Sequence, residues 1–229
     1  MDIPVDVMKS VERQEKDKRK KVLILSLGTG DATYNRMEGD IPKQMYNNKL
    51  YFSSYQNVAY SFDGGETKEH AEFVAYPLIN HSNPDYIFLV GTVKSVWTAF
   101  YSRFVSDDNR SEESINKLYS IEKEGRSELE DKKIIEFQHQ IQEVFDKDID
   151  KSNGSYIRII LTKYGLNEDE IQFNYTQIRT IESNLDEKYE YNVSFDITHS
   201  FRSLPLYNLI ILNYIRQLSS IDIEIEHIY

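Results

Sequence analysis

Residues 191–215 read YNVSFDITHSFRSLPLYNLIILNYI, and this stretch decides the fold. Apolar and polar residues alternate from 191 to 197, which predicts a strand, and the unbroken apolar run from Leu204 predicts a buried helix. The turn between them, THSFRS, gathers hydroxyl, imidazole and guanidinium groups. In an open α/β sheet ligands bind where a strand ends and a helix begins, because the first N–H groups of the helix are unpaired. We therefore expect an anion site here, most simply for a phosphate.

Two earlier stretches repeat this design. VLILSL at 22–27 is a continuous apolar run, typical of a central parallel strand, and it leads into the polar turn GTGDATY. PDYIFLVGTVKSVW at 84–97 is an apolar run followed by a polar turn with Lys94 and Ser95, which opens a helix. Strands alternating with helices predict a parallel sheet, so the turns after all three strands should meet at one edge and form one site.

The remaining pattern predicts the other elements of an α/β fold with flanking helices. The charged segment 106–150 is expected to hold two helices broken near Gly125, acting as a crossover or lid, a dimer arm or a partner surface. The other expected elements are a charged leader at 1–21, a hairpin insertion at 49–65, a helix at 67–80 with Pro77 near its end or kinking it, a strand at 155–165, a helix at 166–185 capped by Asn167, and an antiparallel edge strand at 221–229.

Length and composition narrow the class of protein. The 229 residues suit one α/β domain, and the formal net charge of −11 argues against a broad face for duplex or single-stranded nucleic acid. The chain has no cysteine, its N-terminus lacks the apolar core of a signal peptide, and its longest apolar run is about half of the ~20 residues that span a bilayer. We expect a soluble cytoplasmic protein without a membrane span.

In this order and on these strand ends, SLGTG, VGTVKSVW and FDITHSFRSLPL resemble the CARF domain, the CRISPR-associated Rossmann-fold sensor of type III systems. The resemblance is closest to the branch with a D-x-T-H-x-F-R-S-L-P segment. It departs from that pattern at Ser200, where glycine is usual. It covers residues 22–229 and implies a Rossmann-like parallel sheet.

The resemblance implies a homodimer that binds a cyclic oligoadenylate, most often the tetra-adenylate and otherwise the hexa-adenylate, across its two-fold axis. Binding would control a fused or associated effector in antiviral defence. No metal, cofactor or catalytic residue is assigned. The candidate ligand contacts carried over by position are Gly28, Thr29, Gly30, Asp31, Gly91, Thr92, Lys94, Ser95, Thr198, His199, Ser200, Phe201, Arg202 and Ser203.

Several alternatives stay open at this point. The domain could be a ring nuclease that cleaves the same ligand, with groups such as His199 or Lys94 assisting. Lys94 could simply be solvated, and Arg202 could pair with a neighbouring acid. Asp196 is expected to be a buried acceptor for the turn and not a contact to an anion, and Trp97 a core or interface residue and not a platform for base stacking. The chain has no Arg-x-x-x-x-His ribonuclease pair, so we expect the sensor alone, either naturally standalone or a piece of a longer protein.

A dinucleotide-cofactor enzyme is a weaker reading. After Gly28 and Gly30 the third position of the glycine fingerprint is Thr33, and no helical pattern follows at once.

Overall fold

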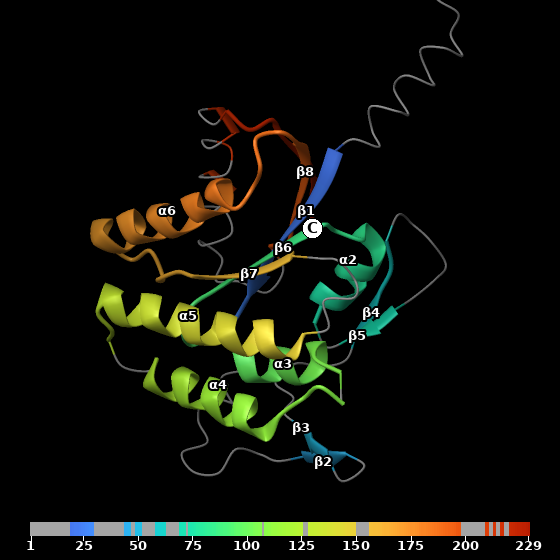
Figure 1. Ribbon diagram of the computed structural model, residues 1–229, viewed down its shortest axis with the longest axis vertical. Helices are drawn as coiled ribbons and strands as arrows, with labels where there is room; N and C mark the ends of the chain where they lie inside the picture. The colour runs from blue at the N-terminus through green and yellow to red at the C-terminus, as the bar shows by residue number, and fades with distance from the viewer. Residues whose placement is uncertain are drawn as a thin grey trace, which may run out of the picture.

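The centre of the molecule is a five-stranded sheet in the order β7-β6-β1-β8-β9 (Figure 1). The computed structural model describes residues 19–29, 44–46, 49–51, 58–62, 69–71, 73–106, 108–125, 128–149, 156–197, 209, 210, 213, 216, 217 and 220–229. The strands of the sheet are β1 (Arg19–Leu27), β6 (Tyr86–Gly91), β7 (Tyr156–Leu161), β8 (Glu190–Phe195) and β9 (Ile223–Ile228). Neighbouring strands are parallel throughout, which confirms the predicted parallel sheet.

The middle strand, β1, is buried on both faces. Its odd-numbered leucines, such as Leu23 and Leu25, belong to one hydrophobic core, whereas Val22 and Ile24 belong to the other. The two sets separate because successive side chains of a strand point to opposite faces. This double burial explains why the run VLILSL has no polar alternation.

Helices cover both faces of the sheet, as in other Rossmann-like folds. On one side Figure 1 shows α3 and α5, and on the other α6. The described helices are α2 (Ala75–Ser82), α3 (Trp97–Phe104), α4 (Glu112–Glu124), α5 (Asp131–Asp148) and α6 (Glu168–Ser183). Asn167 caps α6 as predicted, because its Oδ1 accepts a hydrogen bond from the Glu170 N–H at 2.9 Å. No helix in the described part of the chain is long and apolar enough to cross a membrane.

The charged segment between α3 and β7 forms two helices, as predicted, with Gly125 ending the first. Its apolar residues, among them Leu118 and Phe137, are buried in the same core as α2 and α3. This segment is therefore a crossover that builds one helical layer of the domain.

Two buried carboxylates tie the helices of this layer together. Glu122 of α4 accepts a hydrogen bond from the Thr98 N–H, in the first turn of α3, at 2.6 Å. Asp148 of α5 accepts hydrogen bonds from the Tyr101 hydroxyl at 2.6 Å and from the Ser114 hydroxyl at 2.5 Å. Burial, together with the bond to Asp148, raises the pKa of Tyr101 above its ordinary value. The phenol thus stays protonated and keeps donating to the carboxylate.

The prediction of an antiparallel edge strand was wrong. β9 lies at the edge of the sheet but runs parallel to β8, with Tyr191 opposite Ile223. The connection from 196 to 222 exceeds the roughly dozen residues that a parallel crossover needs, and residues 209, 210 and 213 within it are helical. The alternation in IDIEIEHIY reflects the exposure of an edge strand and does not report its direction.

The insertion between β1 and α2 also differs from the predicted hairpin at 49–65. It contains two separate antiparallel pairs, β2 (Gln44–Tyr46) with β3 (Lys49–Tyr51) and β4 (Val58–Tyr60) with β5 (Glu69–Ala71). β3 and β4, which lie within the predicted hairpin, thus do not pair with each other. β3 pairs with β2, which ends two residues before it, and β4 pairs with β5.

Pro77 lies near the start of its helix, contrary to the prediction. The helix expected at 67–80 begins only at Ala75, because residues 69–71 form β5. Pro77 is therefore in the first turn of α2, where a helix tolerates proline because the N–H groups there have no helical acceptor.

Two glutamines of α5 close the free edge of β7. Gln142 donates from Nε2 to the Ile157 carbonyl at 3.1 Å and accepts from the Ile159 N–H at 2.8 Å. Gln138 accepts from the Leu161 N–H at 2.7 Å. Side-chain amides thus replace a neighbouring strand on an edge that would otherwise present unpaired backbone groups.

We expect Gln142→Leu to lower the free energy of unfolding by about 2 kcal/mol, measured by urea denaturation. The leucine has a similar size but leaves a buried N–H and a carbonyl at the edge of β7 without partners. Gln140→Leu, on the same helix, is the control. Among the described residues the Gln140 side chain bonds Glu136 alone, so its change should stay within about 0.5 kcal/mol. Equal stability of the two variants would show that Gln142 does not protect this edge.

Candidate functional site

The five strands of the central sheet end at one edge because they are parallel. Gly28 and Thr29 follow β1, Thr92 follows β6, and Asp196 follows β8. Hydrogen bonds join these ends: the Val96 N–H donates to the Gly28 carbonyl at 3.1 Å, and the Asp196 N–H donates to the Ile24 carbonyl at 2.8 Å. The predicted convergence of the strand ends is confirmed, and ligands of open α/β sheets bind at such an edge.

Ser95 fixes the turn after β6 against β1. Its hydroxyl accepts a hydrogen bond from the Thr92 N–H at 2.9 Å and donates to the Leu27 carbonyl at 2.6 Å. Ser95 is only 1% exposed. The hydroxyl is therefore engaged within the protein, and what it contributes to a site at this edge is the position of the turn.

The glycine at the end of β6 is required by close packing. A Cβ on Gly91 would lie 2.8 Å from the Ser95 Oγ and 2.9 Å from Cζ2 of Trp97. Trp97 is fully buried, and its indole N–H donates to the Thr92 carbonyl at 2.9 Å. Trp97 is thus a core residue, as predicted, and Gly91 makes room for it and for Ser95.

The N-terminus of α3 is already occupied by a carboxylate of the protein. The turn from Thr92 to Ser95 precedes α3, which begins at Trp97. Glu122 accepts the Thr98 N–H there, so this helix end offers less to an external anion than a free one would. An anion bound beside this turn must therefore be held chiefly by side chains.

Lys94 is the cation that this turn presents. It is half-buried, and its Nζ lies 5.5 Å from the centroid of the Tyr164 ring. Other described lysines over aromatic rings each have a carboxylate partner; these pairs are Lys20 with Asp85, Lys133 with Glu136, Lys163 with Asp131 and Lys188 with Asp186. Among the described residues Lys94 has none. Within the described part of the chain it is thus a charge without a counterion, at the edge where ligands of this fold bind.

The other predicted contacts divide into two groups. Gly28 and Thr92 are buried and Thr29 is half-buried. Gly30, Asp31 and the turn that follows β8 lie outside the described residues; this turn supplies Thr198, His199, Ser200, Phe201, Arg202 and Ser203. Asp196, just before that turn, is 1% exposed. Burial is the main cause that raises the pKa of Tyr60, and the charge of Asp196 raises it further. Its burial agrees with the interpretation of Asp196 as an internal acceptor.

A cavity of about 370 Å³ opens beside Lys94 and holds residues that the sequence analysis missed. We call it the β6–β7 recess. Its lining is Thr92, Val93, Lys94, Gly125, Glu128, Leu129, Ile134, Thr162, Lys163, Tyr164, Leu166 and Glu170. Burial raises the pKa of Tyr164, and a hydrogen bond with the Thr92 side chain opposes the shift. The polar turn TKYG at 162–165, which follows β7 as the other turns follow their strands, was the signal available in the sequence.

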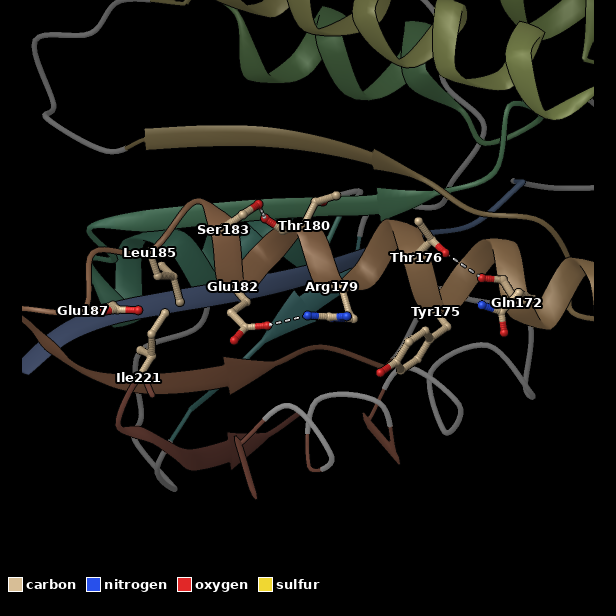
Figure 2. Close-up of a pocket in the computed structure, with 10 residues that line it drawn as sticks. All are labelled: Gln172, Tyr175, Thr176, Arg179, Thr180, Glu182, Ser183, Leu185, Glu187 and Ile221. Atoms are coloured by element: carbon tan, nitrogen blue, oxygen red, sulfur yellow. Dashed lines mark hydrogen bonds and ion pairs between the residues drawn. The ribbon is translucent and has the colours of Figure 1, made fainter. Parts of the chain in front are cut away.

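A larger groove of about 640 Å³ runs along α6 (Figure 2). Its polar lining includes Arg179, whose guanidinium is already paired with Glu182 at 3.7 Å. Leu185 and Ile221, at one end of the groove, belong to the second hydrophobic core. None of the described candidate contacts lines it. We therefore place the candidate site at the strand ends.

We expect Ser95→Ala to lower the free energy of unfolding by about 1–3 kcal/mol, because it leaves the Thr92 N–H and the Leu27 carbonyl without their partner. Urea denaturation measures the change. The matched control is Ser102→Ala, since Ser102 is equally buried but donates only to the Thr98 carbonyl one helical turn earlier. Equal losses in the two variants would contradict a special role for the Ser95 hydroxyl.

Comparison with known proteins supplies the family. Residues 39–229 match the family model described as "CRISPR system endoribonuclease Csx1, CARF domain". The chain is also 30% identical over 213 residues to "CRISPR-associated protein MJ1674" of Methanocaldococcus jannaschii, an alignment that covers 89% of this chain. The chain spans only 30% of the length of that relative. The match to the family model over most of the chain, together with the parallel sheet, shows that the chain belongs to the Csx1 CARF domain family of CRISPR-associated proteins.

Proposed function

We propose that this domain is a sensor that binds a cyclic oligoadenylate, foremost the tetra-adenylate, at the strand-end edge. The observation that carries the proposal is Lys94. In a chain with a formal net charge of −11, this ammonium group has no carboxylate partner within the described residues and stands at the edge where α/β sheets bind ligands. A phosphodiester supplies the missing negative charge.

The proposed site takes further groups from the turns at the same edge. Thr29 after β1 is half-buried and adds a hydroxyl. Arg202, in the turn after β8, adds a guanidinium that can bind a phosphate through two parallel hydrogen bonds. Binding needs no metal or cofactor in this scheme, because cationic side chains and hydroxyls supply the contacts.

We further propose that the ligand binds across the two-fold axis of a homodimer. A ring with two-fold symmetry presents the same groups to two identical subunits, as an isologous interface requires. Leu209 packs against the second core, while its neighbour Ile210 is 59% exposed. The helix predicted after residue 203 thus carries apolar side chains in more than one direction, which supports a second surface for a partner.

In this scheme, ligand binding shifts the dimer between two arrangements and so controls an effector that is fused to the domain or associated with it. The ligand can shift this equilibrium only by the difference between its affinities for the two arrangements. Contacts from both subunits to one ring provide such a difference, because they form only when the subunits are correctly placed.

The test is calorimetric titration of the chain with cyclic tri-, tetra- and hexa-adenylate, followed by chromatography of the ligand. We expect one intact tetra-adenylate ring per two chains. Lys94→Ala should weaken binding about tenfold or more, because it removes a charged contact to phosphate. Lys133→Ala is the matched control: Lys133 also lies over a ring, at 4.6 Å from the Phe137 centroid, but is paired with Glu136.

Two outcomes would count against the sensor. If no ring binds, the proposed ligand is wrong. If a ring binds but is recovered as a linear product, the domain is a ring nuclease. Equal affinities for wild type and Lys94→Ala would remove Lys94 from the site while leaving the ligand in place.

A further inference from the structure

The β6–β7 recess adjoins the proposed phosphate contact but lies on the far side of β6 from β1. Thr92 and Lys94 line it from the turn after β6, and Thr162 and Tyr164 from the turn after β7. Gly125, Glu128 and Leu129, between α4 and α5, and Glu170 at the start of α6 add to the wall. In Figure 1, β6 and β7 lie side by side, with α5 on one face and α6 on the other. Lys94 is therefore shared between the strand-end edge and the recess.

The size of the recess limits what can enter it. Its volume of about 370 Å³ is near the lower end of the roughly 300–1,000 Å³ of small-molecule sites. A whole cyclic oligonucleotide is too large, whereas a single nucleobase is not. Because one ribose joins a base to its phosphate, a phosphate at Lys94 brings its own base to the mouth of this cavity.

The chemistry of the lining suits a flat heteroaromatic ring. Val93, Leu129 and Ile134 supply apolar surface, and Tyr164 supplies an aromatic one. Bases stack on aromatic side chains in proteins that bind single-stranded nucleic acids. The tyrosine is a neutral phenol at physiological pH, since burial raises its pKa.

Most polar groups of the recess already have partners. The Lys163 ammonium is paired with Asp131 at 2.5 Å, and the Thr162 hydroxyl donates to the Gly91 carbonyl at 3.3 Å. Glu170 accepts the Leu166 N–H at 2.9 Å. Glu128 is exposed and has no hydrogen bond or ion pair with any other described residue. Among the described residues its carboxylate is thus an open acceptor at this cavity.

We propose that the β6–β7 recess is a base-reading subsite that receives one adenine of the ligand, with Tyr164 forming its aromatic wall and Glu128 accepting a hydrogen bond from the exocyclic amino group. The inference rests on the proposed function, because it assigns a base of the same ligand. An ionised carboxylate only accepts hydrogen bonds. It pairs with the amino group of adenine and faces a second acceptor when a 6-oxo purine replaces adenine.

The test compares cyclic tetra-adenylate with cyclic tetra-inosinate, which carries an oxo group in place of each amino group. We expect the wild-type chain to bind the adenylate ring at least tenfold more tightly, because a site built for a donor rejects an analogue that lacks it. Glu128→Gln should reduce this preference to below threefold, since an amide can donate to the oxo group as well as accept. Glu130→Gln, two residues away and outside the recess, should retain it.

Variants of Tyr164 test the aromatic wall separately. Tyr164→Ala should weaken both rings about tenfold by removing the stacking surface, and Tyr164→Phe should bind within about threefold of wild type. A circular dichroism melt confirms that each variant is folded before titration.

The outcomes separate the two proposals. If wild type binds neither of these rings nor cyclic tri- or hexa-adenylate, the proposed function fails. If wild type binds the adenylate ring but does not distinguish it from the inosinate ring, the base-reading subsite is wrong and the function stands. The same conclusion follows if Glu128→Gln retains the full preference, or if Tyr164→Ala binds as tightly as wild type.

Discussion

The burial of β1 on both faces is the constraint on which the rest of the structure depends. A strand whose successive side chains enter two different cores needs helices above and below it. Helices reach both faces only when the chain crosses back after each strand, and such crossovers make the strands parallel. Parallel strands bring all their carboxyl ends to one edge. The position of the candidate site thus follows from the burial of six residues, 22–27, in the middle of the sheet.

Polar side chains then set the positions of the helices and turns with hydrogen bonds that burial makes costly to break. Ser95 joins the turn after β6 to β1, and Glu122 joins α4 to the first turn of α3. Gly125, where α4 ends, packs against Val93 in the turn after β6. Val93 fills the space that a Cβ on Gly125 would need. The turn that carries Lys94 is therefore held by β1 on one side and by the α3–α5 layer on the other. Such support keeps a binding side chain in place without the ligand.

Local patterns predicted the elements whose structure depends on neighbouring residues. The unbroken run of β1, the Asn167 cap of α6 and the core position of Trp97 are examples. Features that depend on distant parts of the chain could not be predicted in this way. The direction of β9 is set by how the preceding crossover returns, and Pro77 lies near the start of α2 because β5 occupies the residues before it. Tyr164, which follows β7, lies beside Lys94 only because β7 pairs with β6, a strand order that periodicity does not encode.

An acidic chain can bind an anionic ligand because distant charges are screened, whereas the charges next to the site act on the ligand directly. Screening limits the reach of exposed charges to roughly 8–10 Å at physiological ionic strength, so the net charge of −11 is not felt as one quantity at the strand ends. What matters there is which carboxylates stand next to which cations. Lys163, a neighbour of Lys94 in the recess, is neutralised by Asp131, and Glu122 and Asp148 are taken up by hydrogen bonds inside the α3–α5 layer. These three carboxylates thus serve the scaffold, and among the described residues none pairs with Lys94, whose charge can meet a ligand.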